Sequence, residues 1–367
     1  MELCSNCILP KHLPGVSFDE KGVCNYCNAY KKKHFDNSNF PAEKIQKSLE
    51  NILRKSRGKG DYDCLIPLSG GKDSTYLLYL AVKKYNMKVL AVNFDNGFRA
   101  PQAVENIENA VNKLGVDLIV FKLRQEIMLK LFRTFLIETG EFCTPCNMAI
   151  GAITKKIAKK YGIRTILTGN SRRMSAALER ISPAEYYDRV YFLNVINGHI
   201  PYKEVKNYIE EPYIIKGIKR IIGSAQENVA TLEYLNVTLD EIKNTLINEV
   251  YWKNPSNRIE HGDCLLDELK NYIMYKRWGI SEVTGIYSAL VRSGQISREV
   301  ALKKANAEEA TCPINLQLFL EKTTLTESEF NEALNKDFRD IPNIRNTHFF
   351  RLVKIGIDKM SKILRRR

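Results

Sequence analysis

The chain has 367 residues, of which 44% are hydrophobic and 27% are charged, the composition of a soluble globular protein. No stretch is apolar and long enough to cross a membrane, and the first residues lack the charged and apolar regions of a signal peptide, so we expect a cytoplasmic protein without a membrane partner. The net charge of +14 suits acidic partners such as ATP, nucleotide-sugars or RNA without choosing among them.

Residues 1–35 carry two C-x-x-C pairs separated by 16 residues, at Cys4, Cys7, Cys24 and Cys27. This spacing is typical of a four-cysteine zinc site, because tetrahedral Zn²⁺ takes four thiolates. The segment is too short and rich in loops to form its own apolar core, so the metal would supply its folding free energy. We predict a structural zinc knuckle over residues 1–35, with reduced, unligated thiols as the alternative.

Residues 36–175 are predicted to form an α/β domain. A polar helix and linker over residues 37–60 come first, and strands and helices then alternate. The predicted strands cover residues 65–68, 89–94, 118–123 and 165–168, and the predicted helices cover 75–84, 102–114, 126–138 and 148–161. Such alternation predicts a doubly wound parallel sheet that binds ligands at the carboxyl ends of its strands.

A glycine turn follows the first predicted strand and opens the next helix. It consists of Ser69, Gly70, Gly71, Lys72, Asp73 and Ser74. The turn directs backbone N–H groups and the positive end of a helix dipole at one point, which suits phosphate. Its glycines permit close approach, and its lysine and serines add charge and hydroxyl donors. The spacing does not match the Walker pattern, and an ordinary strand–helix turn is the alternative.

This hexapeptide resembles the loop of the PP-loop ATP pyrophosphatase superfamily, which has the adenine nucleotide α-hydrolase type of fold. The resemblance implies that ATP is cleaved between its α and β phosphates and that AMP is attached to a substrate oxygen, with Lys72, Asp73 and Ser74 as catalytic residues. Ammonia or sulfide then attacks the adenylated carbon. Because a carboxylate inside a phosphate loop needs a nearby cation, we expect Asp73 to contact Mg²⁺ bound to ATP.

The ends of two other strands complete the expected ATP site. By the resemblance, Asn93 and Asp95 flank the adenosine, although Asp-Asn-Gly is also a common turn. Gly169 and Asn170 resemble the stretch that sets backbone against the nucleotide phosphates. The arginines that follow, Arg172 and Arg173, are candidates for holding the departing pyrophosphate and the substrate, or else are simply exposed.

A third C-x-x-C pair, Cys143 and Cys146, comes directly before a predicted helix. A helix N-terminus lowers the pKa of a thiol, which favours metal-binding or reactive thiolates. The pair resembles that of cluster-dependent tRNA thiolases, in which two such cysteines and a distant third hold a 4Fe–4S cluster. The third ligand here would be Cys264 or, less favourably, Cys312. A second zinc or redox pair and purely structural thiols are the alternatives.

Residues 176–367 are predicted to be a mainly helical region for substrate or partner binding. Its expected helices cover residues 202–209, 238–250, 265–277, 281–291 and 297–305, and Thr326 with Glu329 forms an expected capping box. His261 is a candidate substrate contact. Trp252 and Trp278 are near it in sequence and would suit stacking on a sugar or a base.

The whole chain resembles the N-acetyl sugar amidotransferases of the WbpG/PseA kind. The resemblance includes the four-cysteine segment, the glycine turn, the Cys-Thr-Pro-Cys-Asn segment and the stretches 276–280 and 291–299. It implies an AMP-forming enzyme that converts the N-acetyl group of a bacterial surface-polysaccharide sugar, expected in a nucleotide-linked form, into an acetamidino group. Ammonia would come from glutaminase and ammonia-channelling subunits that resemble the histidine-biosynthesis pair.

Two other functions stay open at this point. A tRNA thiolase would use the same adenylation with sulfide as the nucleophile, but the chain has no recognisable RNA-binding appendage, so a nucleic-acid partner is not expected. An ATP-binding regulator without catalysis is disfavoured by the intact Lys72 and Asp73.

Overall fold

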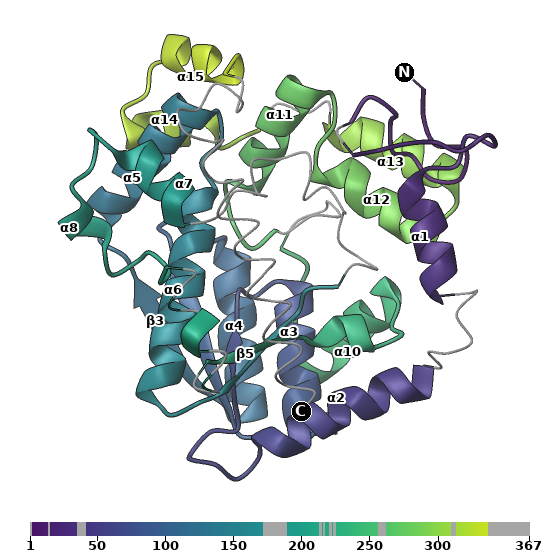
Figure 1. Ribbon diagram of the computed structural model, residues 1–367, viewed down its shortest axis with the longest axis vertical. Coiled ribbons are helices and arrows are strands. Elements are labelled where there is room, and N and C mark those ends of the chain that lie inside the picture. Colours follow the sequence, from purple (N-terminus) through teal and green to yellow (C-terminus); the bar gives the residue numbers. More distant parts are fainter. Residues whose placement is uncertain are drawn as a thin grey trace.

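Figure 1 shows the computed structural model, which describes residues 2–13, 15–34, 42–171, 189–212, 215, 217–219, 222, 225–255, 262–309 and 313–336. A five-stranded sheet lies at its centre in the order β3-β2-β1-β4-β5. The strands are β1 (Cys64–Pro67), β2 (Val89–Asp95), β3 (Asp117–Lys122), β4 (Thr165–Thr168) and β5 (Glu227–Ala230). Each neighbouring pair is parallel, which confirms the predicted α/β class.

Helices alternate with the first four strands, as predicted. They are α3 (Lys72–Tyr79), which continues as a π-helical turn (Leu80–Lys84), α4 (Pro101–Leu114), α5 (Gln125–Thr139) and α6 (Thr144–Lys160). Two helices precede them, α1 (Asn25–His34) and α2 (Ala42–Ser56). The helix after the glycine turn begins at Lys72, three residues before its predicted start, so its first turn includes the lysine and aspartate of the loop.

The C-terminal region is mainly helical, as predicted. Its helices are α7 (Arg189–Ile196), α8 (Tyr202–Val205), α10 (Leu239–Val250), α11 (Asp267–Trp278), α12 (Glu282–Arg292), α13 (Arg298–Glu309), α14 (Leu316–Thr323) and α15 (Glu327–Leu334), with a 3-10 turn at Thr231–Tyr234. The capping box of Thr326 and Glu329 is present at the start of α15, where each side chain accepts the other residue's backbone N–H. No helix among these described segments is long and apolar enough to cross a membrane.

The fifth strand is a departure from the sequence prediction, which placed no strand beyond residue 175. β5 pairs with β4 from Thr165↔Glu227 to Thr168↔Ala230. Its four residues lack an apolar run, since Val229 is the buried one, and strand formation there depends on the exposed edge of β4. The predicted helix at 202–209 is also shorter than expected, because α8 ends at Val205.

Alternating side chains of the strands face two different helical layers. Cys64, Ile66 and Leu68 pack in one cluster with residues of α2, α3, α4 and α10. Leu65 packs on the opposite face, in a cluster that includes Ala158 of α6. A two-residue period of this kind follows from the pleat of a strand, and burial on both faces explains why β1 is apolar throughout. Cys64 is therefore a core residue, as the sequence suggested.

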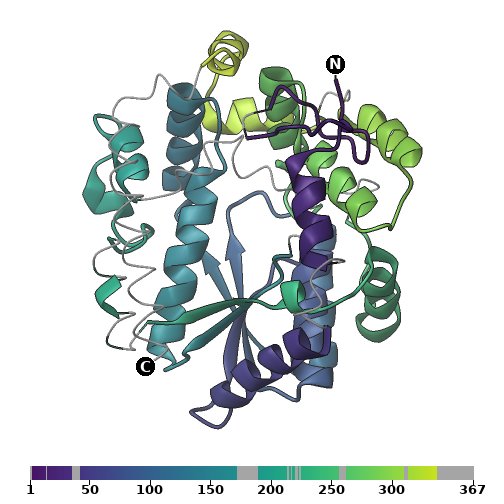
Figure 2. The ribbon, with the colours of Figure 1, turned by 45° about the vertical axis from the view of Figure 1, so that its right-hand side comes forward.

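The strand order creates a switch point between β1 and β4. The chain builds β2 and β3 on one side of β1 and then returns to build β4 and β5 on the other. Crossovers therefore leave β1 in opposite directions, and a crevice opens outside the carboxyl ends of these two strands. In Figure 2 the strand arrowheads point toward the half of the molecule that contains α11 and α12.

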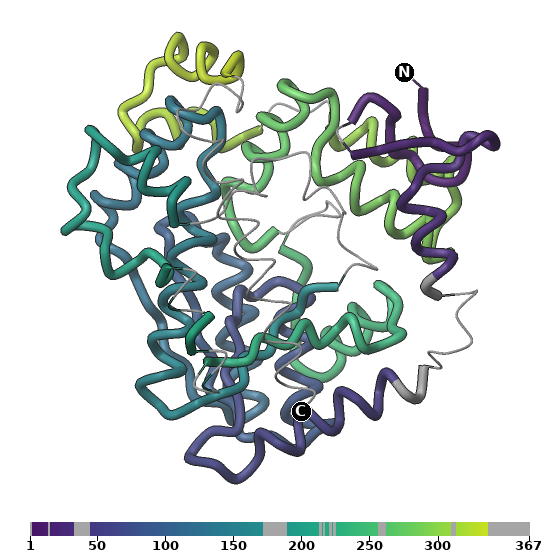
Figure 3. The backbone as a smooth tube through the Cα atoms, in the orientation of Figure 1, coloured from purple at the N-terminus to yellow at the C-terminus, as the bar shows by residue number. Residues whose placement is uncertain are grey.

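The N-terminal segment packs against helices that are far away in the sequence. Figure 3 shows its purple tube beside the green helices α12 and α13. Ile8 is buried in one cluster with Val283 and Leu290 of α12. Arg298, at the start of α13, donates through Nε to the carbonyl oxygens of Cys4 at 3.2 Å and Cys7 at 3.0 Å.

Candidate active site

The glycine turn lies at the switch point, between the end of β1 and the start of α3. Gly70 has a φ of +83°, the left-handed region that glycine adopts without strain. The hydroxyls of Ser69 and Ser74 lie 3.0 Å apart, and Ser74 Oγ also accepts the backbone N–H of Ser69 at 3.2 Å. The turn is thereby closed on itself at the N-terminus of a helix, which is the arrangement that binds phosphate.

The charged pair of the loop is partly buried. Lys72 Nζ lies 3.1 Å from Asp73 Oδ2. The second carboxylate oxygen of Asp73 is buried and has no hydrogen-bond partner among the described residues. Gly169, after β4, lies directly against this residue, because a Cβ there would be 2.9 Å from the Asp73 carbonyl carbon. The structure thus brings the Thr168–Asn170 segment against the glycine turn, and Asn170 itself is exposed.

The side chains of Asn93 and Asp95 make bonds within the protein. Asn93 is 2% exposed, donates to the carbonyl oxygen of Leu68 at 2.8 Å and accepts from Arg99 Nη1 at 2.9 Å. Asp95 accepts from Arg99 Nη2 at 3.0 Å and from the backbone N–H of Gly97 at 2.8 Å. Arg99, which the sequence analysis did not single out, is therefore held by two residues at the end of β2.

A cavity of about 350 Å³ opens beside the glycine turn. Its lining includes Ser69 of the turn, Asn93 and Arg99 of the β2 end, and three cysteines, Cys143, Cys146 and Cys264. The two C-x-x-C cysteines come from the start of α6, and the third comes from a segment more than a hundred residues later. The proposed third ligand is thus at the same cavity as the pair.

Cys264 reaches the cavity because its segment pairs with the chain after β2. Arg99 and Cys264 form an isolated antiparallel bridge. On either side of it, the N–H of Ala100 donates to the Asp263 carbonyl at 3.0 Å and the N–H of Leu265 donates to the Phe98 carbonyl at 2.8 Å. These backbone bonds fix the residues around Cys264 against the carboxyl end of the sheet.

The three cavity cysteines are spaced more widely than the ligands of a single ion. Asn96 Nδ2 lies between two of them, 3.5 Å from Cys146 Sγ and 3.6 Å from Cys264 Sγ. Among the described residues, the four knuckle cysteines are the group of metal-ligating side chains whose ligand atoms all lie within 4.8 Å of one another, and the cavity cysteines do not form such a group. A tetrahedral zinc ion with Zn–S of about 2.3 Å needs sulfurs about 3.8 Å apart. Each thiolate of an iron–sulfur cluster instead binds a different iron, which suits the wider spacing.

Burial works against ionisation of the cavity thiols. It raises the pKa of Cys143 and Cys146 well above the ordinary value and raises the pKa of Cys264 to about 11. The expectation that the helix N-terminus would give low-pKa thiols is therefore wrong, because desolvation outweighs the helix dipole here. A bound cation would be needed to draw the protons off.

A buried charged group is also part of the cavity lining. Lys270 of α11 lies 2.6 Å from Asp267 Oδ1 and 2.7 Å from Glu282 Oε2. Burial alone would lower the pKa of Lys270, but the two carboxylates outweigh it and raise that pKa well above its ordinary value. All three residues line the cavity, so it contains a fixed ammonium group with two counter-ions as well as the three cysteines.

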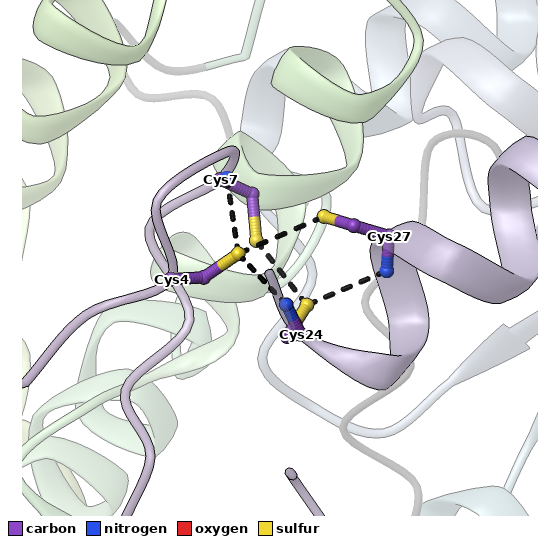
Figure 4. Close-up of side chains that lie close together, drawn as sticks. All are labelled: Cys4, Cys7, Cys24 and Cys27. Carbon is purple, nitrogen blue, oxygen red and sulfur yellow. Dashed lines mark hydrogen bonds between the residues drawn. The ribbon is translucent and has the colours of Figure 1, made fainter. Parts of the chain in front are cut away.

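The four knuckle cysteines come together as predicted. Figure 4 shows them converging from the N-terminal loop and the start of α1. The sulfurs of Cys4 and Cys27 are 3.9 Å apart and those of Cys7 and Cys24 are 3.8 Å apart. These separations match the value of about 3.8 Å that a tetrahedral Zn–S₄ site requires. The group can therefore hold a metal ion with all four positions filled by protein.

Hydrogen-bond donors surround the sulfurs of Cys4 and Cys7 in the knuckle. The backbone N–H groups of Asn6, Cys7 and Cys24 approach Cys4 Sγ at 3.2–3.4 Å. Hydrogen bonds led by that from Cys24 lower the pKa of Cys7 to about 7, whereas hydrogen bonds among the four sulfurs raise the pKa of Cys24 and Cys27. Arg292, which is 9% exposed, brings its Nη1 to 3.7 Å from Cys7 Sγ. A buried guanidinium thus offsets part of the charge of the four sulfurs.

Some predicted residues lie outside the described residues. They are Arg172, Arg173, His261 and Cys312. The expectation that Trp252 stacks on a ligand is wrong, because this side chain is 3% exposed and its Nε1 donates to the carbonyl oxygen of Gly70 at 2.9 Å. Trp278 is partly buried against the four-cysteine cluster.

Several residues of the site were missed from the sequence. Asn96 and Arg99 follow the same strand end as Asn93 and Asp95, so their position was a signal that could have been used. Asp267, Lys270 and Glu282 lie on helices that the sequence predicted, but nothing local marks those positions as facing a cavity.

Two family comparisons match different parts of the chain. Residues 231–362 match the LPS biosynthesis protein WbpG-like, C-terminal domain. Residues 63–173 match the queuosine biosynthesis protein QueC. A curated relative is the uncharacterized protein MJ1599 of Methanocaldococcus jannaschii, which is 25% identical over 303 residues, covering 82% of this chain and 92% of the relative.

Solved structures give only distant likenesses. NMN synthetase from Francisella tularensis has a TM-score of 0.38 at 14% identity, over 78% of this chain and 98% of that one. The U34-tRNA thiolase NcsA from Methanococcus maripaludis, with its [4Fe-4S] cluster, has a TM-score of 0.35 at 14% identity, over 86% and 91%. These scores are too low to carry an argument about function. The glycine turn at the switch point and the two family matches support a PP-loop superfamily protein with a WbpG-like C-terminal domain.

Proposed function

We propose that this protein is an ATP-dependent, AMP-forming amidotransferase that converts the N-acetyl group of a sugar into an acetamidino group. One observation carries the proposal. The cavity beside the glycine turn is also lined by residues of the WbpG-like part, including Cys264, Lys270 and Glu282. The glycine turn and the WbpG-like part thus line the same cavity. This arrangement suits transfer of AMP from ATP to a sugar bound by the WbpG-like part.

ATP would be held by the glycine turn. Its N–H groups, the Lys72 ammonium group and the hydroxyls of Ser69 and Ser74 all favour the phosphates. Asp73 is suited to the accompanying Mg²⁺, because its buried second oxygen lacks a hydrogen-bond partner among the described residues and Mg²⁺ prefers carboxylate oxygens. The metal would neutralise charge on the phosphates, while Lys72 stabilises charge that develops at the α-phosphate.

The proposed reaction has two steps, adenylation of the amide oxygen and displacement of AMP by ammonia. The amide oxygen of the N-acetyl group attacks the α-phosphorus of ATP, the bond to the bridging oxygen breaks, and pyrophosphate leaves. Ammonia then adds to the adenylated carbon, and AMP departs with the former amide oxygen. The products are an acetamidine, AMP and pyrophosphate. AMP leaves far more readily than oxide, which is why the first step is needed.

Ammonia is proposed to come from a separate glutaminase with an ammonia-channelling subunit, and the substrate is proposed to be a nucleotide-linked N-acetylated sugar. The knuckle is proposed to hold structural zinc, supported by its sulfur separations of 3.8 and 3.9 Å. Cys143, Cys146 and Cys264 are proposed as ligands of a 4Fe–4S cluster, supported by their shared cavity and wide spacing. Such a cluster would supply a Lewis-acidic iron beside the loop.

The decisive experiment follows an oxygen atom. The protein is incubated with MgATP, ammonium chloride and a nucleotide-linked N-acetyl sugar labelled with ¹⁸O in the acetyl group. The proposal expects AMP that carries ¹⁸O, unlabelled pyrophosphate and a sugar that gains an amidine nitrogen. ADP as the product would contradict the PP-loop chemistry. Lys72→Met is the control, and it should abolish AMP formation.

One observation favours a second candidate function, a tRNA thiolase. Three cysteines line the cavity beside the glycine turn, and a cluster held by them would suit delivery of sulfide to an adenylated tRNA as well as it suits the amidotransferase reaction. The same assay with unmodified tRNA and sulfide distinguishes the two. A thiolated tRNA, with no amidine formed on the sugar, would replace the first proposal with this one.

A further inference from the structure

The Gly70–Gly71 peptide is held in one orientation by groups outside the glycine turn. Its carbonyl oxygen, on Gly70, accepts two hydrogen bonds from the interior. Its N–H, on Gly71, donates to Ser69 Oγ at 3.3 Å, a hydroxyl that lines the cavity. In a trans peptide the C=O and N–H bonds point in opposite directions. Holding the oxygen inward therefore directs the N–H outward, to the side of the cavity that Ser69 lines.

The first of the two donors comes from the WbpG-like part of the chain. Trp252 Nε1 donates to Gly70 O at 2.9 Å, and the indole is 3% exposed. Trp252 follows α10 and belongs to the core cluster beneath the sheet. A buried indole N–H needs a partner, and here its partner is a loop carbonyl.

The second donor comes from α4. Asn106 is fully buried, and its Nδ2 lies 3.2 Å from Gly70 O and 2.8 Å from the carbonyl oxygen of Lys253. Its Oδ1 accepts the backbone N–H of Lys253 at 2.9 Å. Asn106 thus bonds both the loop carbonyl and the residue next to Trp252, so the two donors act as one unit.

We propose that Trp252 and Asn106 are positioning residues that keep the Gly71 N–H directed at the nucleotide phosphates. Glycine on both sides gives this peptide little steric resistance to turning over. Without the two donors, the Gly70 oxygen would be free to face the phosphates, replacing an attractive N–H with a repulsive carbonyl. The inference rests on the proposed ATP site, and it assigns the WbpG-like region a role in ATP binding.

The test measures binding of two probes to the full-length protein by calorimetry. One probe is α,β-methylene-ATP with Mg²⁺, which has phosphates but is not cleaved at that bond, and the other is adenosine. Trp252→Phe keeps most of the ring volume and removes the donor. We expect it to weaken binding of the ATP analogue about tenfold, the loss of one hydrogen bond to a charged group, and to leave adenosine binding unchanged.

Asn106→Leu removes the other donor, and its effect on binding of the ATP analogue can be measured whether or not Trp252→Phe folds. Asn109→Ala is the matched control, because Asn109 lies on the same helix and contacts Tyr251 O at 3.5 Å. It should bind both probes like the unchanged protein. Equal weakening of adenosine and analogue by Trp252→Phe would contradict a role specific to phosphate.

Lys72→Met separates failure of this inference from failure of the proposed function. Where Lys72→Met loses analogue binding but neither Trp252→Phe nor Asn106→Leu does, the inference is wrong and the ATP site stands. Where Lys72→Met binds the analogue normally, the ATP site itself is wrong, and the inference fails with it.

Discussion

Gly70 lies so close to Ala103 of α4 that a side chain does not fit between them. A Cβ on Gly70 would be 2.2 Å from the Ala103 carbonyl oxygen and 2.8 Å from its carbonyl carbon. Both of these atoms belong to backbone, which cannot swing aside as a flexible side chain can. The glycine turn is therefore packed directly against the first turn of α4, in addition to its hydrogen bonds with Trp252 and Asn106.

Gly70→Ala should displace the loop and weaken ATP binding more than tenfold. The substitution adds the clash with α4 to the cost of a positive φ, which is about 1–2 kcal/mol for residues with a Cβ. Gly58→Ala is a matched control, since Gly58 has a φ of +69° and nothing within 4 Å of the added carbon. It carries the same backbone cost without the clash. Similar ATP affinities for the two variants would contradict this account.

Removal of metal should loosen the N-terminal knuckle. We expect elemental analysis to find one zinc ion per chain at the knuckle of the unchanged protein. Cys24→Ser removes one of the four sulfurs and should abolish that zinc binding. Because Ile8 is buried against α12, loss of the knuckle exposes core and should lower Tm by about 5 °C or more. Cys64→Ala is the control, because this core cysteine should leave the zinc content unchanged. A Cys24→Ser protein with full zinc content would refute the assignment.

Arg292 should strengthen metal binding at the knuckle. Four thiolates around Zn²⁺ have a net charge of −2, and the buried guanidinium beside Cys7 offsets part of it. Arg292→Met should reduce zinc affinity about ten- to a hundredfold, measured by competition with a chromogenic chelator. Lys303→Met, an exposed cation on α13, should not change it. Equal effects of the two substitutions would mean that net charge alone matters.

Patterns of neighbouring residues in the sequence predicted the first four strands, the glycine turn and the four-cysteine knuckle. The four strands from residue 64 to 168 lie within one residue of their predicted ends, because apolar runs between turn residues mark parallel strands. The glycine turn is a run of six consecutive residues, and the knuckle is two C-x-x-C pairs separated by 16 residues. Both patterns can be recognised in the sequence because the spacing of their residues is tied to phosphate or metal binding. The three-cysteine cavity was anticipated from one C-x-x-C pair and the family resemblance, and its bridge between Arg99 and Cys264 had no local signal.

Long-range packing explains what the sequence did not reveal. β5 is a strand because β4 offers an unpaired edge, and its own four residues do not indicate one. Trp252 looked like a stacking residue, but its partner is a loop 182 positions away in the chain. Lys270 and Glu282 are separated by a helix end, and only the turn between α11 and α12 brings their charges to 2.7 Å. Such contacts depend on tertiary structure that propensity does not encode.

The cavity cysteines should bind iron when the protein is purified without oxygen. We expect about four irons and four sulfides per chain, with broad absorbance in the visible range. Cys143→Ala and Cys264→Ala should each lose the iron, because each removes one of three ligands. Cys64→Ala should keep it, since Cys64 packs in the core under the sheet. An active protein free of iron would refute the cluster, and zinc at these cysteines would favour the second-zinc alternative.

The capping box at α15 gives a pH-dependent contribution to stability. The backbone N–H of Thr326, followed by the Arg133 guanidinium, holds the pKa of Glu329 below its ordinary value of 4.5. A lowered carboxyl pKa stabilises the folded state above that value, and the contribution is lost as pH falls through the lowered pKa. Arg133 Nη2 lies 2.6 Å from Glu329 Oε1, so this contribution also joins α15 to α5.

Glu329→Gln should therefore lower Tm by about 2 °C at pH 7, and the difference should disappear in acid. Glutamine keeps an acceptor for the Thr326 N–H but lacks the charge, which makes it a mimic of protonated Glu329. Glu327→Gln is the matched control, because Glu327 lies in the same first turn and shares the helix dipole without being the capping-box partner. Thermal melts of both variants from pH 3 to pH 8 provide the measurement. A Glu329→Gln deficit that persists at pH 3 would mean that shape, and not charge, is responsible.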